Sequence, residues 1–183
     1  MQAGDEQLML AYRGGDAGAF EELYRRHKGG LFRFVLRSVR ERAVAEELYQ
    51  EIWMRAIEAR GRYEAQAKFS TWLYTIAHNR LVDHWRKRGL QLVSLDQEDG
   101  SPVEPAAGAA YEPQRIVEAK QGIERFARAL AALPPAQREA FLMHQEAEMS
   151  VAEIARATGA NEEAAKSRLR YALSKLKEAM ADD

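Results

Sequence analysis

Few side chains in this sequence could carry out chemistry, and they do not form a catalytic or metal-binding set. His78, Asp83 and His84 come nearest to a metal site, but spacings of five and six residues scatter them around a helix. Two metal ligands on one helical face need a spacing of three or four residues. No histidine can be placed beside a serine and an aspartate as a nucleophilic triad, and the glycine patterns of phosphate and dinucleotide sites are missing. We therefore expect no enzyme activity, no metal and no cofactor.

Residues 69–88 combine aromatic and basic side chains in one stretch, which suits contact with a nucleic-acid strand. The pattern predicts a single helix, capped at its N-terminus by Ser70 and ending in three cations before Gly89. Aromatic rings stack on bases and cations attract phosphates. An apolar stripe and a polar stripe lie about half a turn apart, formed by Leu73, Ala77, Leu81 and Trp85 and by Thr75, Asn79, Asp83 and Arg86. A half-buried helix with a solvated basic end is the alternative, and the segment alone does not decide.

The composition is that of a soluble globular protein of one or two domains. The 183 residues are 30% charged and 46% hydrophobic, with a net charge of -1. There is no cysteine, which excludes disulfides and cysteine-ligated metals. No apolar run approaches the roughly 18 residues of a membrane span, and no signal peptide is recognisable at the N-terminus. We expect a cytoplasmic protein without membrane insertion.

Charge and helical periodicity divide the chain into three parts. Residues 1–90 hold 16 Lys and Arg against 12 Asp and Glu, a net charge of +4, and are helical apart from a Gly29-Gly30 interruption. Asp16 can cap the helix that contains this interruption. Residues 91–114 carry a net charge of -5, and their prolines and glycines predict a flexible linker over 91–113. Residues 114–183 are balanced in charge and helical. The predicted fold is all-α, with two helical domains joined by a flexible linker.

The second half of the C-terminal domain has the pattern of a helix-turn-helix. Ser150 and Glu153 form a capping box, the short helix they open ends at Thr158-Gly159, and Asn161 can cap the next helix. That last helix buries Ala165, Leu169, Ala172, Leu173 and Leu176 in our interpretation. In the major groove its outward row would place Lys166, Ser167 and Arg170 at base edges and Arg168 at phosphate. An ordinary helical hairpin is the alternative.

Four blocks in this order resemble the extracytoplasmic-function (group 4) sigma factors of the bacterial sigma-70 family. They are Ala19-Phe-Glu-Glu-Leu-Tyr24, Ala45-Glu-Glu-Leu-Tyr-Gln-Glu-Ile-Trp53, Phe69-Ser-Thr-Trp-Leu-Tyr-Thr-Ile-Ala-His-Asn-Arg80, and Leu133-Pro-Pro-Ala-Gln-Arg-Glu-Ala-Phe141 with the helix-turn-helix. The resemblance implies a sigma factor that binds core RNA polymerase and directs initiation at specific promoters. Residues 1–90 would be region 2 and residues 114–183 region 4. The acidic linker would thread toward the RNA channels of the polymerase.

The resemblance also implies roles for individual residues. The -10 element would be read on the non-template strand, with the 61–68 loop receiving an unstacked base, and the -35 element would be read as duplex. The family usually has aspartate at positions 44 and 47, where this chain has Val44 and Glu47. An anti-sigma factor is a further candidate partner. The implied sites are Glu47, Leu48, Gln50 and Glu51 for the polymerase; Tyr63, Trp72, Asn79, Asp83, Arg86 and Lys87 for the -10 element; and Lys166, Ser167, Arg168 and Arg170 for the -35 element.

Two other classes of protein remain as rivals. A free-standing helix-turn-helix repressor would bind duplex operator unaided, but it leaves the 45–53 block and the 69–88 helix without a purpose. A helical enzyme has no acid-base set to support it. A gel shift with and without core polymerase separates the sigma factor from the repressor.

Overall fold

The computed structural model describes residues 1–89 and 114–181, and every regular element in these ranges is helical. The all-α prediction is confirmed for this part of the chain. The predicted linker, residues 91–113, lies outside the described residues. The helices are α1 (Asp5–Arg13), α2 (Ala17–Val39), α3 (Arg42–Glu58), α4 (Phe69–Lys87), α5 (Gln114–Ala132), α6 (Pro135–Ala147), α7 (Val151–Thr158) and α8 (Glu162–Ala181), with a short 3-10 turn, η1 (Arg60–Arg62), before the loop that leads into α4.

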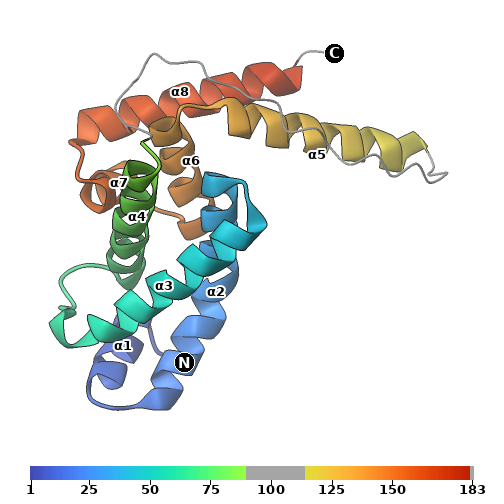
Figure 1. Cartoon of the computed structure of the whole chain (residues 1–183). Coiled ribbons are helices and arrows are strands. Elements are labelled where there is room, and N and C mark those ends of the chain that lie inside the picture. The colour runs from blue at the N-terminus through green and yellow to red at the C-terminus, as the bar shows by residue number, and fades with distance from the viewer. Residues whose placement is uncertain (90–113, 182–183) are drawn as a thin grey trace.

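The N-terminal helices α1–α4 pack around an aromatic and aliphatic core (Figure 1). Asp16 caps α2 as predicted, accepting a hydrogen bond of 3.3 Å from the Ala19 amide. Helix α4 packs against α3 and α2, so its apolar stripe is buried. Burial of large side chains in this way removes apolar surface from water, which supplies most of the free energy that holds the bundle together.

The Gly29-Gly30 pair does not interrupt α2, which runs unbroken from Ala17 to Val39. The reason for Gly30 is a close approach of another helix. A Cβ atom at this position would lie 3.1 Å from the backbone oxygen of Glu146, at the end of α6. The glycine costs helix propensity, but it allows the C-terminal domain to reach the surface of α2.

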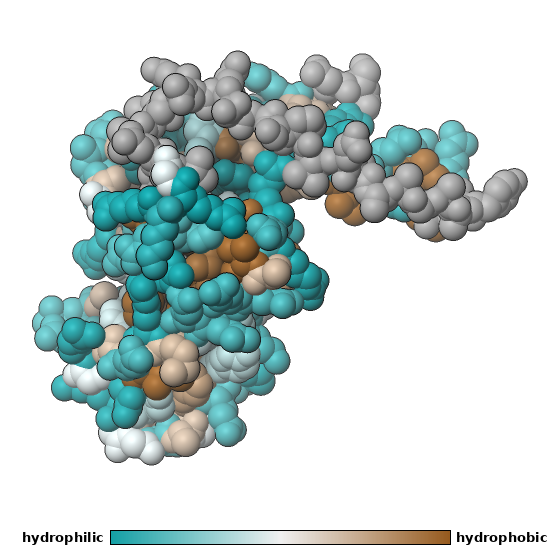
Figure 2. Space-filling view, viewed as in Figure 1, coloured by the Kyte–Doolittle hydropathy of each residue, from teal (hydrophilic) through white to brown (hydrophobic). Residues whose placement is uncertain are grey.

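The C-terminal domain contains the predicted helix-turn-helix. Ser150 and Glu153 form the capping box, with hydrogen bonds of 2.8 and 3.2 Å, and Asn161 accepts a bond of 2.8 Å from the Ala164 amide. Gly159 has φ +69°, a left-handed conformation that ends α7 at low cost for glycine. Helices α6, α7 and α8 pack on one another, while the first half of α5 projects from the body and leaves Ile116 and Ile123 exposed (Figures 1 and 2).

The two domains contact each other through two helix pairs, α2 with α6 and α4 with α7. Glu146 accepts hydrogen bonds from Arg33 Nε at 2.9 Å and Arg37 Nη1 at 2.7 Å, and only 7% of its side chain is exposed. His78 Nδ1 lies 2.6 Å from Glu139 Oε1; the Glu139 side chain is buried and that of His78 is largely buried. These ion pairs join the domains directly, in addition to the chain that connects them.

Two details of the predicted elements are corrected by the structure. Ser70 does not cap α4, because the helix begins at Phe69 and the Phe69 amide donates instead to Glu6 Oε1 at 3.0 Å. The cap therefore comes from α1, a helix distant in sequence. Leu173, predicted in the buried stripe of α8, is 45% exposed. Position 173 lies at the edge of the apolar stripe, and the packed neighbours cover only its centre.

Candidate nucleic-acid interface

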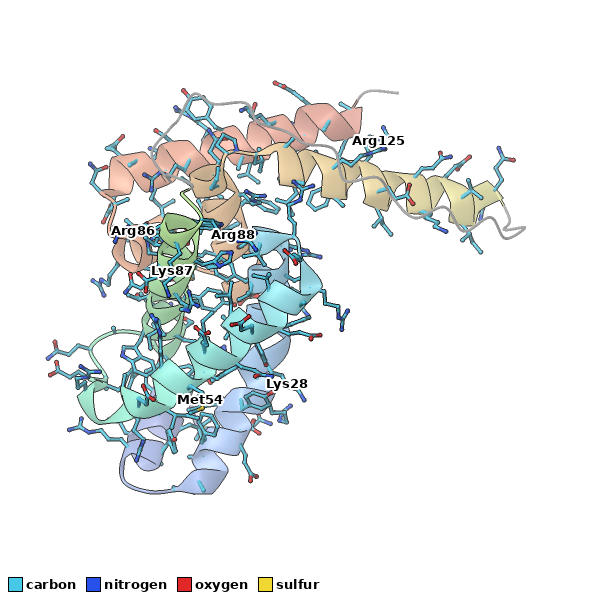
Figure 3. The ribbon with its side chains drawn as sticks, in the orientation of Figure 1. Lys28, Met54, Arg86, Lys87, Arg88 and Arg125 are labelled. Carbon is cyan, nitrogen blue, oxygen red and sulfur yellow. The ribbon has the colours of Figure 1, made fainter. Side chains whose placement is uncertain are left out.

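The basic end of α4 is exposed in the described part of the chain. Arg86, Lys87 and Arg88 lie together at this end in Figure 3. Arg88 is 3.6 Å from Glu41, whereas Arg86 and Lys87 form no hydrogen bond or ion pair with the described residues. Exposed cations of this kind bind a polyanion without first breaking an internal ion pair. Cations also suit a helix C-terminus, where the helix dipole is negative.

The polar stripe of α4 is only partly available. Asn79 is exposed, and its side chain has no hydrogen-bond partner within residues 1–89 and 114–181. Asp83 is paired with Arg55 of α3 at 3.4 Å, an interaction that the sequence analysis did not anticipate. The guanidinium balances a carboxylate that would otherwise repel phosphate. Thr75 turns its hydroxyl to the Thr71 carbonyl at 2.7 Å, so Asn79 is the exposed polar group at the middle of the stripe.

Tyr63 is buried, contrary to what a stacking surface needs. None of its side chain is exposed, its hydroxyl donates to the Ala67 carbonyl at 3.1 Å, and its ring meets Trp72 edge to face at 5.3 Å. Burial, with a further contribution from the nearby carboxylates of Glu6 and Asp5, raises the pKa of Tyr63 to about 12. Tyr63 supports the loop from inside. The partly exposed Trp72 is the aromatic side chain within reach of the surface.

The exposed residues of the loop lie around this support. After Tyr63 they are Glu64, Ala65, Gln66 and Lys68, and before it Gly61 and Arg62. The side chain of Lys68 reaches the C-terminal domain, where its ammonium group lies 2.8 Å from Glu153 Oε1. The hydrogen bond from Lys68 is the largest of the contacts that hold the pKa of Glu153 below its ordinary value. The loop that would receive a base is thus connected to the capping box of the helix-turn-helix.

The predicted polymerase-facing residues on α3 divide into exposed and internal positions. Glu47 and Gln50 are exposed, whereas Leu48 is buried in the core with 2% of its surface accessible. Glu51 accepts a hydrogen bond from Arg80 of α4, which lowers the pKa of the Glu51 carboxyl. The exposed face is completed by Met54, 55% exposed and seven residues beyond Glu47 (Figure 3). The spacing of Met54, four residues after Gln50 and seven after Glu47, is the sequence signal that could have placed it on the same helical face.

The outward row of α8 is arranged as predicted. Lys166 and Arg170 are exposed, four residues apart on one face, and Ser167 and Arg168 are half-buried beside them. The Arg170 guanidinium lies 5.3 Å from the centre of the Tyr171 ring, a contact that leaves its donors available. The structure therefore places the -35 candidates side by side on α8, whereas the -10 candidates are spread along α4, from Trp72 near its start to Lys87 at its end, and Tyr63 is buried in the loop before it.

The histidines and aspartate considered for a metal site point to different partners. His78 pairs with Glu139, Asp83 pairs with Arg55, and burial, with a contribution from Arg88 and Arg80, lowers the pKa of His84. No group of three or more potential metal ligands is found in the described part of the chain. Among its helices, none has the length and apolar character to cross a membrane.

A helical domain with an exposed basic helix end, followed by a helix-turn-helix, is an arrangement typical of DNA-binding proteins. Two family models match these same parts: Sigma-70 region 2 over residues 23–91, and Sigma-70, region 4 over residues 123–176. The RNA polymerase sigma factor CarQ of Myxococcus xanthus is 32% identical over 174 residues, 95% of this chain and 96% of CarQ. The ECF RNA polymerase sigma factor RpoE of Cereibacter sphaeroides is 31% identical, over 91% of this chain and 88% of RpoE.

Solved structures show the same fold. The structure of CnrH in complex with the cytosolic domain of CnrY has a TM-score of 0.69 at 21% identity and covers 98% of this chain and 99% of that chain. The sigma factor RpoE of Bartonella quintana, in complex with the anti-sigma factor NepR, has a TM-score of 0.66 at 24% identity, with coverages of 90% and 98%. The present chain belongs to the extracytoplasmic-function sigma factors of the sigma-70 family. It is a sigma factor that directs promoter-specific initiation of transcription with RNA polymerase.

Proposed function

We propose a division of labour among three exposed surfaces of this sigma factor. The exposed face of α3, with Glu47, Gln50 and Met54, docks on core polymerase. Helix α4 and the 61–68 loop receive the -10 non-template strand, with Arg86 and Lys87 on its backbone. The outward row of α8 reads the -35 duplex. The observation that carries this assignment is the exposed basic end of α4, where Arg86 and Lys87 form no ion pair with the described residues, on the same helix as the exposed Asn79.

In this assignment Leu48 and Tyr63 act from within, and the partly exposed Glu51 acts through its contact with α4. Leu48 holds the docking helix in the core, and Glu51 ties that helix to α4 through Arg80. Tyr63 supports the loop, and Trp72 is the ring available to an unstacked base. Stacking of a base on an aromatic side chain contributes about 1–3 kcal/mol.

Reading both promoter elements requires the two domains to separate. The -10 and -35 elements lie about 25 base pairs apart, which is roughly 85 Å at 3.4 Å per base pair. In the structure α4 and α7 are in contact, and Lys68 of the loop pairs with Glu153 of α7. A single rigid arrangement of this kind cannot cover that distance. We therefore assign the contacting arrangement to the free protein.

The protein acts in this proposal as a specificity subunit without catalysis of its own, in the cytoplasm where its polymerase works. A protein regulator of the anti-sigma class is proposed as a further partner. The support is two solved structures with the same fold, in which CnrH is in complex with the cytosolic domain of CnrY and RpoE is in complex with the anti-sigma factor NepR. Such a partner would act by keeping the polymerase-facing and DNA-facing surfaces covered.

The docking surface is tested by titration of core polymerase with fluorescent sigma factor. Replacing Glu47, Gln50 and Met54 together with alanine should weaken core binding while the helical content stays unchanged. Glu21→Ala, an exposed carboxylate on α2, is the matched control. Parent affinity in the triple variant would refute the surface. A gel shift should show promoter binding with core polymerase and none without it, and duplex binding by the chain alone would favour the repressor class.

A further inference from the structure

Helix α1 contacts both ends of the loop that is proposed to receive a promoter base. The region 2 family model begins at residue 23, so α1 lies outside the matched part of the chain. At the first end of the loop, Arg13 Nη1 donates to the Tyr63 carbonyl at 2.9 Å. At the second end, Glu6 accepts from the Phe69 amide at 3.0 Å. One short helix therefore fixes the loop at residues 63 and 69.

Both contacts fix backbone atoms of the loop. The Phe69 amide belongs to the first turn of α4, where amides have no partner within the helix, and Glu6 supplies the partner. A carboxylate at this position is also favoured by the positive end of the helix dipole. The Tyr63 carbonyl marks the place where the chain leaves η1. Backbone contacts of this kind determine the path of the chain between them.

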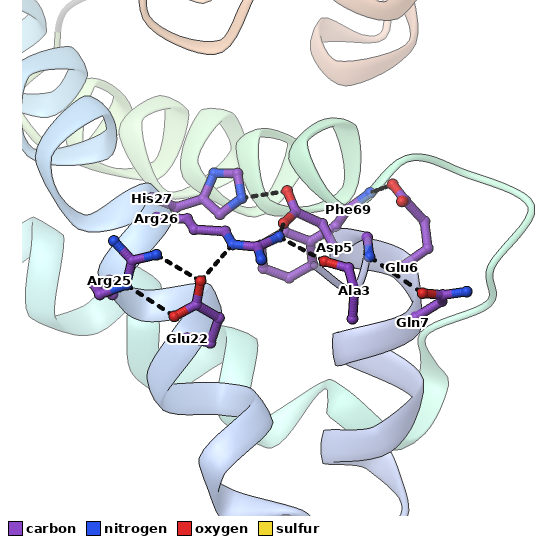
Figure 4. Close-up of polar contacts among 10 residues, drawn as sticks. Ala3, Asp5, Glu6, Gln7, Glu22, Arg25, Arg26, His27 and Phe69 are labelled. Atoms are coloured by element: carbon purple, nitrogen blue, oxygen red, sulfur yellow. Dashed lines mark hydrogen bonds and ion pairs between the residues drawn. The ribbon is translucent and has the colours of Figure 1, made fainter. Parts of the chain in front are cut away.

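Helix α1 is itself held firmly by α2, as Figure 4 shows. Asp5 accepts from Arg26 Nη1 at 2.9 Å and lies 2.6 Å from His27 Nε2. Arg26 also donates to the Ala3 carbonyl at 2.9 Å. Met9, on α1 itself, is buried in the core. The position of α1 is therefore fixed by α2 independently of the loop. The contacts from α1 then fix the two ends of the loop.

The centre of the loop, Glu64, Ala65 and Gln66, is exposed and has few contacts of its own. Tyr63 donates to the Ala67 carbonyl from inside, the Ala67 amide donates to the Glu64 carbonyl at 3.5 Å, and Lys68 at the end of the loop reaches Glu153. A pocket for an unstacked base must keep its shape before the base arrives, because ordering the loop on binding would cost about 1–2 kcal/mol per residue. The two contacts from α1 supply that order in the free protein.

We propose that α1 is a positioning element for promoter reading, in which Glu6 and Arg13 hold the two ends of the base-receiving loop. The inference rests on the proposed role of the 61–68 loop. It adds two residues outside the matched family region that determine -10 selectivity without touching DNA. The -35 selectivity of α8 does not depend on them.

The test uses holoenzyme reconstituted from the full chain and core polymerase, and forked promoter DNA whose single-stranded -10 segment is randomised. Selection and sequencing give the base preference at each -10 position. The loop variants Glu64→Ala and Gln66→Ala identify the position that the loop reads. At that position, the double variant Glu6→Ala with Arg13→Ala should lose about fivefold or more of the parent preference, the lower end of what one specific base contact contributes. Its -35 preference should be unchanged.

The conservative changes Glu6→Gln and Arg13→Lys keep an acceptor and a donor, so they should restore the preference. Leu10→Ala, at an exposed position of the same helix, leaves both loop contacts in place and should behave as the parent. Parent-like preference in the Glu6→Ala, Arg13→Ala variant would overturn the inference. So would an equal loss of preference at every -10 position, if the Glu6→Gln and Arg13→Lys changes show the same loss. If the loop variants alter no -10 position, the proposed role of the loop fails first, and the inference fails with it.

Discussion

Glu146 is the residue whose loss should open the two domains most directly. Its carboxylate is almost buried and accepts from two arginines of the other domain, at 2.9 and 2.7 Å. A hydrogen bond to a charged group contributes about 1.5–3 kcal/mol when well shielded and less when exposed. Since Arg33 and Arg37 are about half exposed, we expect roughly 2 kcal/mol for the pair of contacts together, about a 30-fold shift of the equilibrium toward separated domains.

The change is Glu146→Gln, which keeps the shape of the side chain and removes its charge. The chain has no cysteine, so one cysteine in each domain can be introduced and labelled for single-molecule energy transfer. Glu58 on α3 and Lys175 on α8 are exposed positions for the labels. We expect the parent to be mostly in the high-transfer state and the variant to shift toward low transfer. Added salt should shift the parent more than the variant, because salt screens partly exposed charges.

A second perturbation acts on shape instead of charge. Gly30→Ala places a Cβ atom 3.1 Å from the Glu146 backbone oxygen, so it should also favour separated domains, although alanine improves the helix propensity of α2. Gln145→Ala, an exposed neighbour on α6, and Gly122→Ala, on α5 with no atom near its added Cβ, are the controls. Energy-transfer distributions that coincide for the parent, Glu146→Gln and Gly30→Ala would refute the reasoning that these contacts hold the domains together.

Three further predictions concern the exposed surfaces and the bundle. Arg170→Ala should cost about 1–3 kcal/mol at one base pair and relax the preference there, if it meets a base edge; a -35 variant panel measures both. Replacing Arg86 and Lys87 with alanine should reduce the slope of log K against log salt by about 1.4 for a single-stranded -10 segment, and an unchanged slope would show that neither meets phosphate. The Arg80 contact lowers the pKa of Glu51. The stabilisation of the folded protein by this contact is therefore complete above the ordinary glutamate pKa and decreases as acid protonates the folded carboxylate. The difference in unfolding free energy between parent and Glu51→Gln should shrink on acidification below about pH 4.5.

Local signals predicted the helices and their ends well. The Asp16 cap, the Ser150 and Glu153 capping box and the Asn161 cap are all confirmed at the residues named from the sequence. Each depends on a hydrogen bond between residues three apart. Such contacts join sequence neighbours, so residue types at the right spacing indicate them. The Ser70 cap is the exception, because Glu6 of the distant α1 meets the start of α4.

The surface assignments were less predictable, because burial depends on which helices pack together. Glu47 and Leu48 are adjacent in sequence, yet one is exposed and the other lies in the core. Tyr63 looked suited to stacking, but the loop folds over its ring. The exposed Met54 was overlooked, because an apolar residue in a helix is usually taken as core.

The sequence by itself determined the helical elements, the helix-turn-helix and the family, since all three reside in contacts or motifs a few residues long. Only the tertiary structure decided which residue caps α4, what holds the 61–68 loop and how the domains meet. Those contacts join residues 63 apart for Glu6 and Phe69, 50 apart for Arg13 and Tyr63, and 113 apart for Arg33 and Glu146. Pairs so distant are brought together by the packing of whole helices, and no local pattern of side chains encodes them.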